Sequence, residues 1–102
     1  MVNKLLLLSL YSNYKIAEKN AKIYLGNHIK LLVSTRINKK FMILDPTNNK
    51  YSHFGQMGYE DYTMHQDDLR RSRYLKRATK IRGDWLQNRY SPNNLSINIL
   101  WQ

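Results

Sequence analysis

The chain has 102 residues, 42% of them hydrophobic and 24% charged, and it contains no cysteine. A single folded domain spanning residues 1–102 fits this length and apolar fraction. The lack of cysteine excludes disulfides, thiolate metal sites and thiol nucleophiles. Every apolar run is shorter than the roughly 18 residues of a membrane-spanning helix. The Leu-rich run at 5–8 has neither the length nor the cleavage site of a secretory signal, so we expect an intracellular, unprocessed protein.

The net charge of +10, from 17 Lys and Arg against 7 Asp and Glu, is the feature of the composition that points to a partner. A magnitude of about 2–8 is usual for the solubility of a small domain, so the excess predicts an anionic partner. Nucleic acid, an acidic protein surface and anionic lipid are the candidates. A basic face that serves solubility alone is the alternative.

The chain opens with helical patterns. Residues 2–10 are an apolar run that fits either a buried strand or the first turns of a helix. Residues 13–25 repeat apolar positions at helical spacing, with Ser12 or Asn13 as the cap. Gly26 follows where a left-handed C-terminal cap belongs. The sequence therefore predicts a short amphipathic helix over 13–25.

The middle of the chain has the period of β-strands. From residue 29 the apolar period changes to two, which predicts strands over 29–35, 41–44 and 51–54. Turn-forming Asp, Pro and Asn fill the segment 45–49 between the second and third strands. We expect an antiparallel meander of these three strands.

The C-terminal part predicts one long helix and an apolar tail. Thr63 and Gln66 have the spacing of a capping box, which predicts a helix over 64–81 that ends before Gly83. The tail over 85–101 is apolar enough that it must dock on the core. The predicted fold class is α+β, with an N-terminal helix, a small three-stranded antiparallel meander, one basic helix packed on it and an apolar C-terminal tail closing the core.

The predicted helix over 64–81 has an apolar face and a basic face. The apolar face comprises Tyr74, Leu75, Ala78 and Ile81. The opposite face carries Arg70, Arg73, Lys76, Arg77 and Lys80. Cations gathered on one face without intervening acids repel one another, which favours contact with a polyanion over an ordinary solvated surface.

Arg71 falls on the apolar side of the same helix. An unpaired guanidinium there would carry a large desolvation cost, so we expect a carboxylate partner. The acids within reach are Asp61, Glu60 and Asp84. We predict a structural ion pair between Arg71 and Asp61 that fixes the glycine-containing loop to the helix.

A cluster of histidines and carboxylates has the chemistry of metal ligands or of a nuclease base. Its members are His53, Asp61, His65, Asp67 and Asp68. Asp67 and Asp68 also suit the start of a helix, and histidines with purely structural roles are commoner than ligands. The sequence has no phosphate loop, nucleophile elbow or dinucleotide fingerprint. We therefore predict no enzyme, no metal site and no cofactor, with a metal-dependent nuclease as a lesser alternative.

Tyrosine is abundant, with 8 residues in the chain. Those near the cations are Tyr51, Tyr59, Tyr62, Tyr74 and Tyr90. Such interleaving of aromatic and basic residues fits the stacking of single-stranded bases. The same rings can instead fill a small core with their hydroxyls at its rim, and this is the interpretation we favour.

Several short motifs occur in a fixed order between residues 13 and 101. They are Tyr24-Leu25-Gly26, His53-Phe54-Gly55, Gly58-Tyr59-Glu60-Asp61-Tyr62-Thr63, His65, Asp68, Arg70-Arg71 and Leu100-Trp101. Together they resemble a family of short, basic, uncharacterised proteins of large nucleocytoplasmic DNA viruses, the giant viruses included. The first ten residues lie outside the resemblance. It implies structural roles for the motifs, with glycines shaping loops, Asp61 and Arg71 forming a buried pair and Trp101 plugging the core.

The resemblance implies a minor capsid or core component rather than an enzyme. Combined with the charge pattern, it predicts a non-enzymatic structural protein of the virion, present in the host cell interior before assembly. Its partner would be an acidic capsid or core protein surface, or packaged DNA, contacted through the basic helix. The alternative is a nucleic-acid-binding protein that acts outside the particle.

Overall fold

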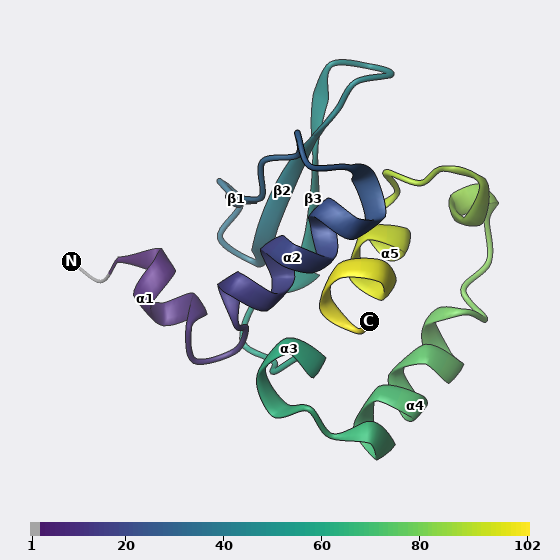
Figure 1. The fold of residues 1–102 in the computed structure, drawn as a ribbon. Coiled ribbons are helices and arrows are strands. Elements are labelled where there is room, and N and C mark those ends of the chain that lie inside the picture. Colours follow the sequence, from purple (N-terminus) through teal and green to yellow (C-terminus); the bar gives the residue numbers. More distant parts are fainter. Residues whose placement is uncertain (1–2) are drawn as a thin grey trace.

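A computed structural model describes residues 3–102 of the chain. Its elements are α1 (Lys4–Leu8), α2 (Tyr14–Leu25), β1 (Leu32–Val33), β2 (Lys39–Asp45), β3 (Lys50–Gln56), α3 (Tyr62–His65), α4 (Asp68–Ala78), the 3-10 helix η1 (Asp84–Gln87), α5 (Pro92–Leu95) and the π-helical turn η2 (Ser96–Leu100). The predicted α+β class, with an N-terminal helix and a three-stranded antiparallel sheet, is confirmed (Figure 1). None of the described helices is long and apolar enough to cross a membrane.

The sheet is a meander in the order β1-β2-β3, and both pairs are antiparallel. Phe41 lies opposite Phe54 in the register, and both rings are fully buried. The first strand is shorter than the predicted 29–35, because only Leu32 and Val33 pair with β2. The alternating apolar pattern begins earlier because Ile29 is buried, although residues 29–31 do not pair with another strand.

The core lies between the sheet, α2 and the C-terminal helical segment. Leu95 and Ile99 of that segment are fully buried, as are Ala17 and Ala21 of α2. The small alanine side chains allow the C-terminal segment to pack closely on α2. The tail therefore docks on the core as predicted, although its pattern had not indicated that it is helical.

Helix α2 begins where the sequence predicts. The side chain of Asn13 accepts a hydrogen bond from Ile16 N at 3.2 Å, which identifies Asn13 rather than Ser12 as the cap. Gly26 has φ 112° and ψ 160°, so it ends the helix in a positive-φ conformation outside the left-handed helical region. The predicted left-handed helical cap at Gly26 is wrong, although its positive φ still favours glycine.

The N-terminal apolar run forms the short helix α1, which projects from one side of the molecule in Figure 1. Of the run predicted over 2–10, Val2 lies outside the described residues. Leu8 is buried, whereas Leu6 is 68% exposed. The Lys4 ammonium donates to the backbone carbonyls of Ser34 and Arg36, each at 2.7 Å, and thereby ties α1 to the loop after β1.

The helix predicted over 64–81 is wrong in its extent, because the structure divides this region into α3 and α4. Asp61 caps α3 by accepting from Thr63 N at 3.0 Å. Gln66 has φ 52° and ends α3 in the left-handed region. Asp67 then caps α4, accepting from Leu69 N at 3.0 Å. The Thr63 hydroxyl, predicted as a cap, instead accepts from the backbone of the segment before α2.

Helix α4 lies beside the C-terminal segment rather than across the sheet (Figure 1). The Tyr74 ring stacks on Trp101, with ring centroids 4.1 Å apart and an interplanar angle of 11°. Near the end of α4, Asn93 Nδ2 donates to Ala78 O at 3.0 Å. The predicted packing of the basic helix on the meander is replaced by this arrangement, because α5 and η2 already cover the apolar side of the sheet.

Candidate polyanion-binding site

The basic face of α4 is exposed to solvent. Arg70, Arg73, Lys76 and Arg77 are all exposed along it. Lys80 is exposed too, but it belongs to the turn after α4, where its backbone N donates to Arg77 O at 3.2 Å. Its predicted place on a continuous helical face is therefore wrong, since the helix ends at Ala78.

The apolar side of α4 is only partly as predicted. Ala78 is buried, and Tyr74 and Leu75 are half-buried. Ile81 is 54% exposed, because the helix has ended before it.

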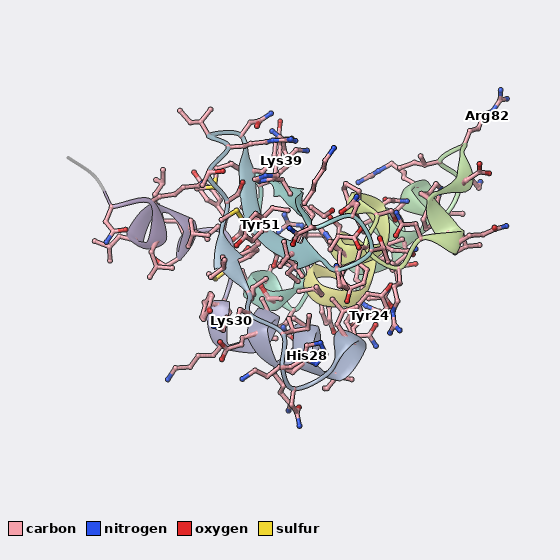
Figure 2. The ribbon with its side chains drawn as sticks, turned by 90° about the horizontal axis from the view of Figure 1, so that it is seen from above. Tyr24, His28, Lys30, Lys39, Tyr51 and Arg82 are labelled. Carbon is pink, nitrogen blue, oxygen red and sulfur yellow. The ribbon has the colours of Figure 1, made fainter. Side chains whose placement is uncertain are left out.

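Positive side chains also occur away from α4: Lys30 and Arg82 point outward from different sides of the molecule in Figure 2. The charge of the protein is thus spread widely, but α4 concentrates it.

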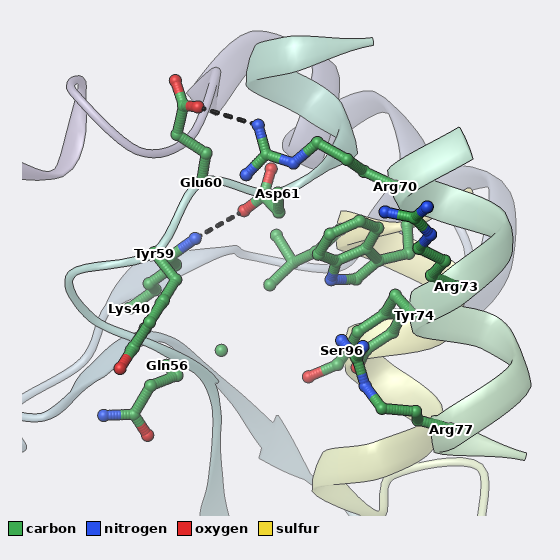
Figure 3. Close-up of a pocket in the computed structure, with 13 residues that line it drawn as sticks. Lys40, Gln56, Tyr59, Glu60, Asp61, Arg70, Arg73, Tyr74, Arg77 and Ser96 are labelled. Carbon is green, nitrogen blue, oxygen red and sulfur yellow. Dashed lines mark hydrogen bonds and ion pairs between the residues drawn. The ribbon is translucent and has the colours of Figure 1, made fainter. Parts of the chain in front are cut away.

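A pocket of about 460 Å³ separates α4 from the ends of β2 and β3 (Figure 3). Arg70, Arg73 and Arg77 line its α4 side. The loop after β3 lines the opposite side with Tyr59 and Glu60. The lining is completed by Lys40, Gly55, Gln56, Asp61, Tyr74, Ser96, Leu100 and Trp101.

An ion pair joins Lys40 and Asp61 at the base of this pocket. Lys40 Nζ lies 2.8 Å from Asp61 Oδ2, and each side chain is 2% exposed. Asp61 also accepts hydrogen bonds from the hydroxyls of Ser12 and Thr63 and from the Thr63 backbone. Burial lowers the pKa of Lys40, and the adjacent Asp61 carboxylate opposes part of that shift. Four donors therefore surround one buried carboxylate.

The predicted pair between Arg71 and Asp61 is wrong, because Asp61 is held by Lys40. Arg71 is half-buried, as its helical phase indicates, and its Nε donates to Trp101 O at 2.7 Å. Its guanidinium carbon also lies 5.5 Å from the centre of the Tyr62 ring. A backbone carbonyl and an aromatic face satisfy the cation without a carboxylate.

Lys40 was not among the predicted site residues, and it directly precedes the strand predicted over 41–44. It lies within β2, and Gly55 of β3 leaves room for its side chain. A Cβ at Gly55 would lie 3.1 Å from Lys40 Cβ and 2.8 Å from Leu100 Cδ1. A signal for this inward-facing lysine was present in the sequence. Lys40 directly precedes a buried apolar run, and a glycine in the neighbouring strand leaves space for its side chain.

The second ion pair is at the pocket rim. Arg70 Nη1 lies 3.2 Å from Glu60 Oε1, and both side chains are more than two-fifths exposed. The ion pairs among residues 3–102 are this one and the Lys40–Asp61 pair. Arg73 and Arg77 therefore line the pocket without a carboxylate partner. Their two charges give the pocket a net positive charge.

The five residues considered as metal ligands are not brought together. No group of three or more His, Asp or Glu side chains within residues 3–102 is placed to hold a metal ion. His53 Nδ1 lies 2.6 Å from Ser34 Oγ, and Asp68 accepts from the Tyr62 hydroxyl at 2.6 Å. His65 Nδ1 accepts from Asp67 N at 2.9 Å and so supports the cap of α4.

The tyrosines near the cations divide between the core and the surface. Tyr90 is buried and belongs to the hydrophobic core, as the core interpretation predicts. Tyr74 and Tyr62 are half-buried beside the C-terminal segment and α4. Tyr51 and Tyr59 are exposed, at 47% and 69%. The core interpretation therefore does not account for these two rings, of which Tyr59 lies at the pocket.

The fold and this pocket define a small α+β domain with a basic helix beside an arginine-lined cavity. Residues 29–78 are similar to a family of unknown function, DUF5754. No curated protein sequence and no solved structure matches the chain. The similar region contains the sheet, α3 and α4, and so includes Lys40, Asp61 and the arginines of the pocket. The expected resemblance to an uncharacterised family is confirmed in this coarse form.

Proposed function

We propose that the protein is a non-enzymatic nucleic-acid-binding protein and that α4 is its contact surface. The observation that carries the proposal is the exposure of Arg73, Lys76 and Arg77 on one helix without a carboxylate partner. Unneutralised cations at this spacing repel one another, and phosphates relieve that repulsion while releasing counterions. Arginine is suited to the role because its planar guanidinium binds phosphate oxygens through two hydrogen bonds.

The setting we propose is the particle of a large DNA virus, where the protein would act as a minor capsid or core component on packaged DNA. The resemblance of the short motifs to proteins of large DNA viruses supports this setting. Detection of the protein in purified particles, and in the DNA-containing layer after stepwise disassembly, would test it. Its presence only in the infected cell would favour action outside the particle.

The contact surface is tested by removing charge from α4 and, in a matched variant, from elsewhere. The first variant carries Arg73→Gln, Lys76→Gln and Arg77→Gln, the three exposed cations of α4 without a carboxylate partner. The control carries Lys15→Gln, Lys19→Gln and Lys30→Gln, three exposed lysines outside α4. Both lose three positive charges, so a difference between them reports position rather than net charge.

Binding to DNA is measured by fluorescence anisotropy at several salt concentrations. Each phosphate contact contributes about 0.9 to the slope of log K against log salt, so the α4 variant should lose about 2 to 3 from the slope. The control should keep most of the slope. Equal losses in the two variants would show that binding is diffuse, and strong binding to an acidic protein but not to DNA would show the wrong class of partner.

A further inference from the structure

The pocket beside α4 has the size of a small-ligand site. Its volume of about 460 Å³ falls within the range of about 300–1,000 Å³ that is typical of such sites. Figure 3 shows that it lies between the arginines of α4 and the loop that bears Tyr59 and Glu60. A single nucleotide fits this volume, whereas the paired and stacked bases of a duplex cannot enter it.

The charges of the pocket match one or two phosphate groups. Lys40 is neutralised by Asp61, and Arg70 is neutralised by Glu60. Arg73 and Arg77 are left over, and both line the same side of the cavity because they are four residues apart on α4. These two guanidiniums provide fork-shaped donors for phosphate oxygens.

The opposite side of the pocket offers a free aromatic ring. Tyr59 is 69% exposed and lies across the cavity from the arginines (Figure 3). The other aromatic side chains in the lining, Tyr74 and Trp101, are stacked on each other at 4.1 Å. Trp101 also has His65 beside it, with ring centroids 5.3 Å apart. Among the described lining residues, Tyr59 is thus the ring whose faces are open to a base.

We infer that this pocket accepts one nucleotide of a single-stranded nucleic acid, with a phosphate against Arg73 and Arg77 and the base stacked on Tyr59. The inference rests on the proposed function and narrows it from nucleic acid in general to unpaired strands. A base can reach Tyr59 only when it is unstacked from its neighbours, so single strands are preferred over duplex. Gln56, exposed at the same rim, is placed to donate to or accept from the base edge.

The test compares Tyr59→Ala with Tyr51→Ala, a matched loss of an exposed tyrosine ring outside the pocket. Trp85→Phe serves as the background, because it leaves Trp101 in the pocket wall as the sole tryptophan. The probes are a fluorescein-labelled oligo-dT, a duplex of the same length and free thymidine monophosphate. Affinity is measured by anisotropy, and occupancy of the pocket by Trp101 fluorescence.

Oligo-dT should bind more tightly than duplex and should change Trp101 fluorescence. Tyr59→Ala should weaken oligo-dT binding about tenfold, as expected for the loss of one stacked base, and leave duplex binding unchanged. Tyr51→Ala should change neither. Free thymidine monophosphate should compete with oligo-dT only weakly, because it lacks the contacts of the neighbouring phosphates with α4.

Each contrary result identifies which statement fails. If both tyrosine variants bind oligo-dT like the parent protein, the pocket is not a base site, while the α4 proposal stands. If the monophosphate binds as tightly as oligo-dT, the ligand is a free nucleotide and the single-strand assignment is overturned. If no nucleic acid binds at all, the proposed function itself fails, whatever the tyrosine variants show.

Discussion

The buried ion pair between Lys40 and Asp61 gives the sharpest stability prediction. Both side chains are 2% exposed and their charged atoms are 2.8 Å apart. Breaking such a pair leaves an uncompensated charge in a region that water does not reach, at a cost of about 3–5 kcal/mol. Asp61→Asn is the direct perturbation, because it removes the negative charge while keeping the shape of the side chain.

The two partners should not be equivalent. In Asp61→Asn the ammonium of Lys40 has no carboxylate left, so we expect the free energy of unfolding to fall by about 3–5 kcal/mol. In Lys40→Met the Asp61 carboxylate keeps its hydrogen bonds from Ser12 and Thr63, so the expected loss is about 1–3 kcal/mol. The double variant should lose less than the sum by about 1–3 kcal/mol, because the two residues are in direct contact.

The measurement is urea-induced unfolding followed by circular dichroism, with the free energy taken from the midpoint and slope. Glu60→Gln is the matched control, because it breaks the exposed pair with Arg70, for which about 0–1 kcal/mol is expected. If Asp61→Asn costs no more than Glu60→Gln, the buried pair does not stabilise the fold as argued. Additive losses in the double variant would show that Lys40 and Asp61 act independently.

Three further predictions follow from the same region. Glu60→Gln frees a pocket arginine, so DNA affinity at low salt should rise severalfold in anisotropy titrations; unchanged or weaker binding would contradict this. Gly55→Ala should lower the free energy of unfolding in urea by about 2–4 kcal/mol, because it forces φ 81° on alanine and places Cβ 2.8 Å from Leu100 Cδ1. A Cβ at Gly58 would meet no neighbour within 4 Å, so Gly58→Ala should cost less. Burial, aided by the nearby Arg70, lowers the pKa of His65 below its usual value of 6.5. Below that pH the unfolded chain binds a proton at His65 more readily than the folded chain does, so the free energy of unfolding should fall as the pH drops. In His65→Gln this pH-dependent loss of stability should be smaller.

The parts of the fold that local chemistry determines were predictable. The period of apolar residues and the cap at Asn13 gave α2, and the turn over 45–49 gave the hairpin of β2 and β3. The end of α3 was not predictable in this way. Asp61 and Asp67 each cap a separate helix, and Gln66 between the two helices has a left-handed backbone conformation. The spacing of apolar residues is that of one amphipathic helix, so it did not indicate the break.

The site was only partly predictable, because its charges pair over long distances in the sequence. The exposed cations of α4 followed from helical phase, and so did the half-buried position of Arg71. The partner of Asp61 did not, since Lys40 is separated from it by 21 residues and the pairing depends on how α3 meets β2. The acceptor of Arg71 is the backbone carbonyl of Trp101. Every residue carries such a carbonyl, so the residue types do not show which one an arginine will contact, and a carboxylate was predicted instead.

The buried pair also fixes the loop side of the pocket. Asp61 holds the start of α3 to β2 through Lys40 and to the segment before α2 through Ser12. The neighbouring Glu60 extends that anchored loop towards Arg70 on α4. The loop is therefore anchored to the sheet at the base of the cavity, while the Arg71 hydrogen bond to Trp101 O and the stacking of Tyr74 on Trp101 hold α4 on the other side. A cavity whose walls are fixed before a ligand arrives loses less conformational entropy on binding, and this favours a specific contact over loose attraction between charges.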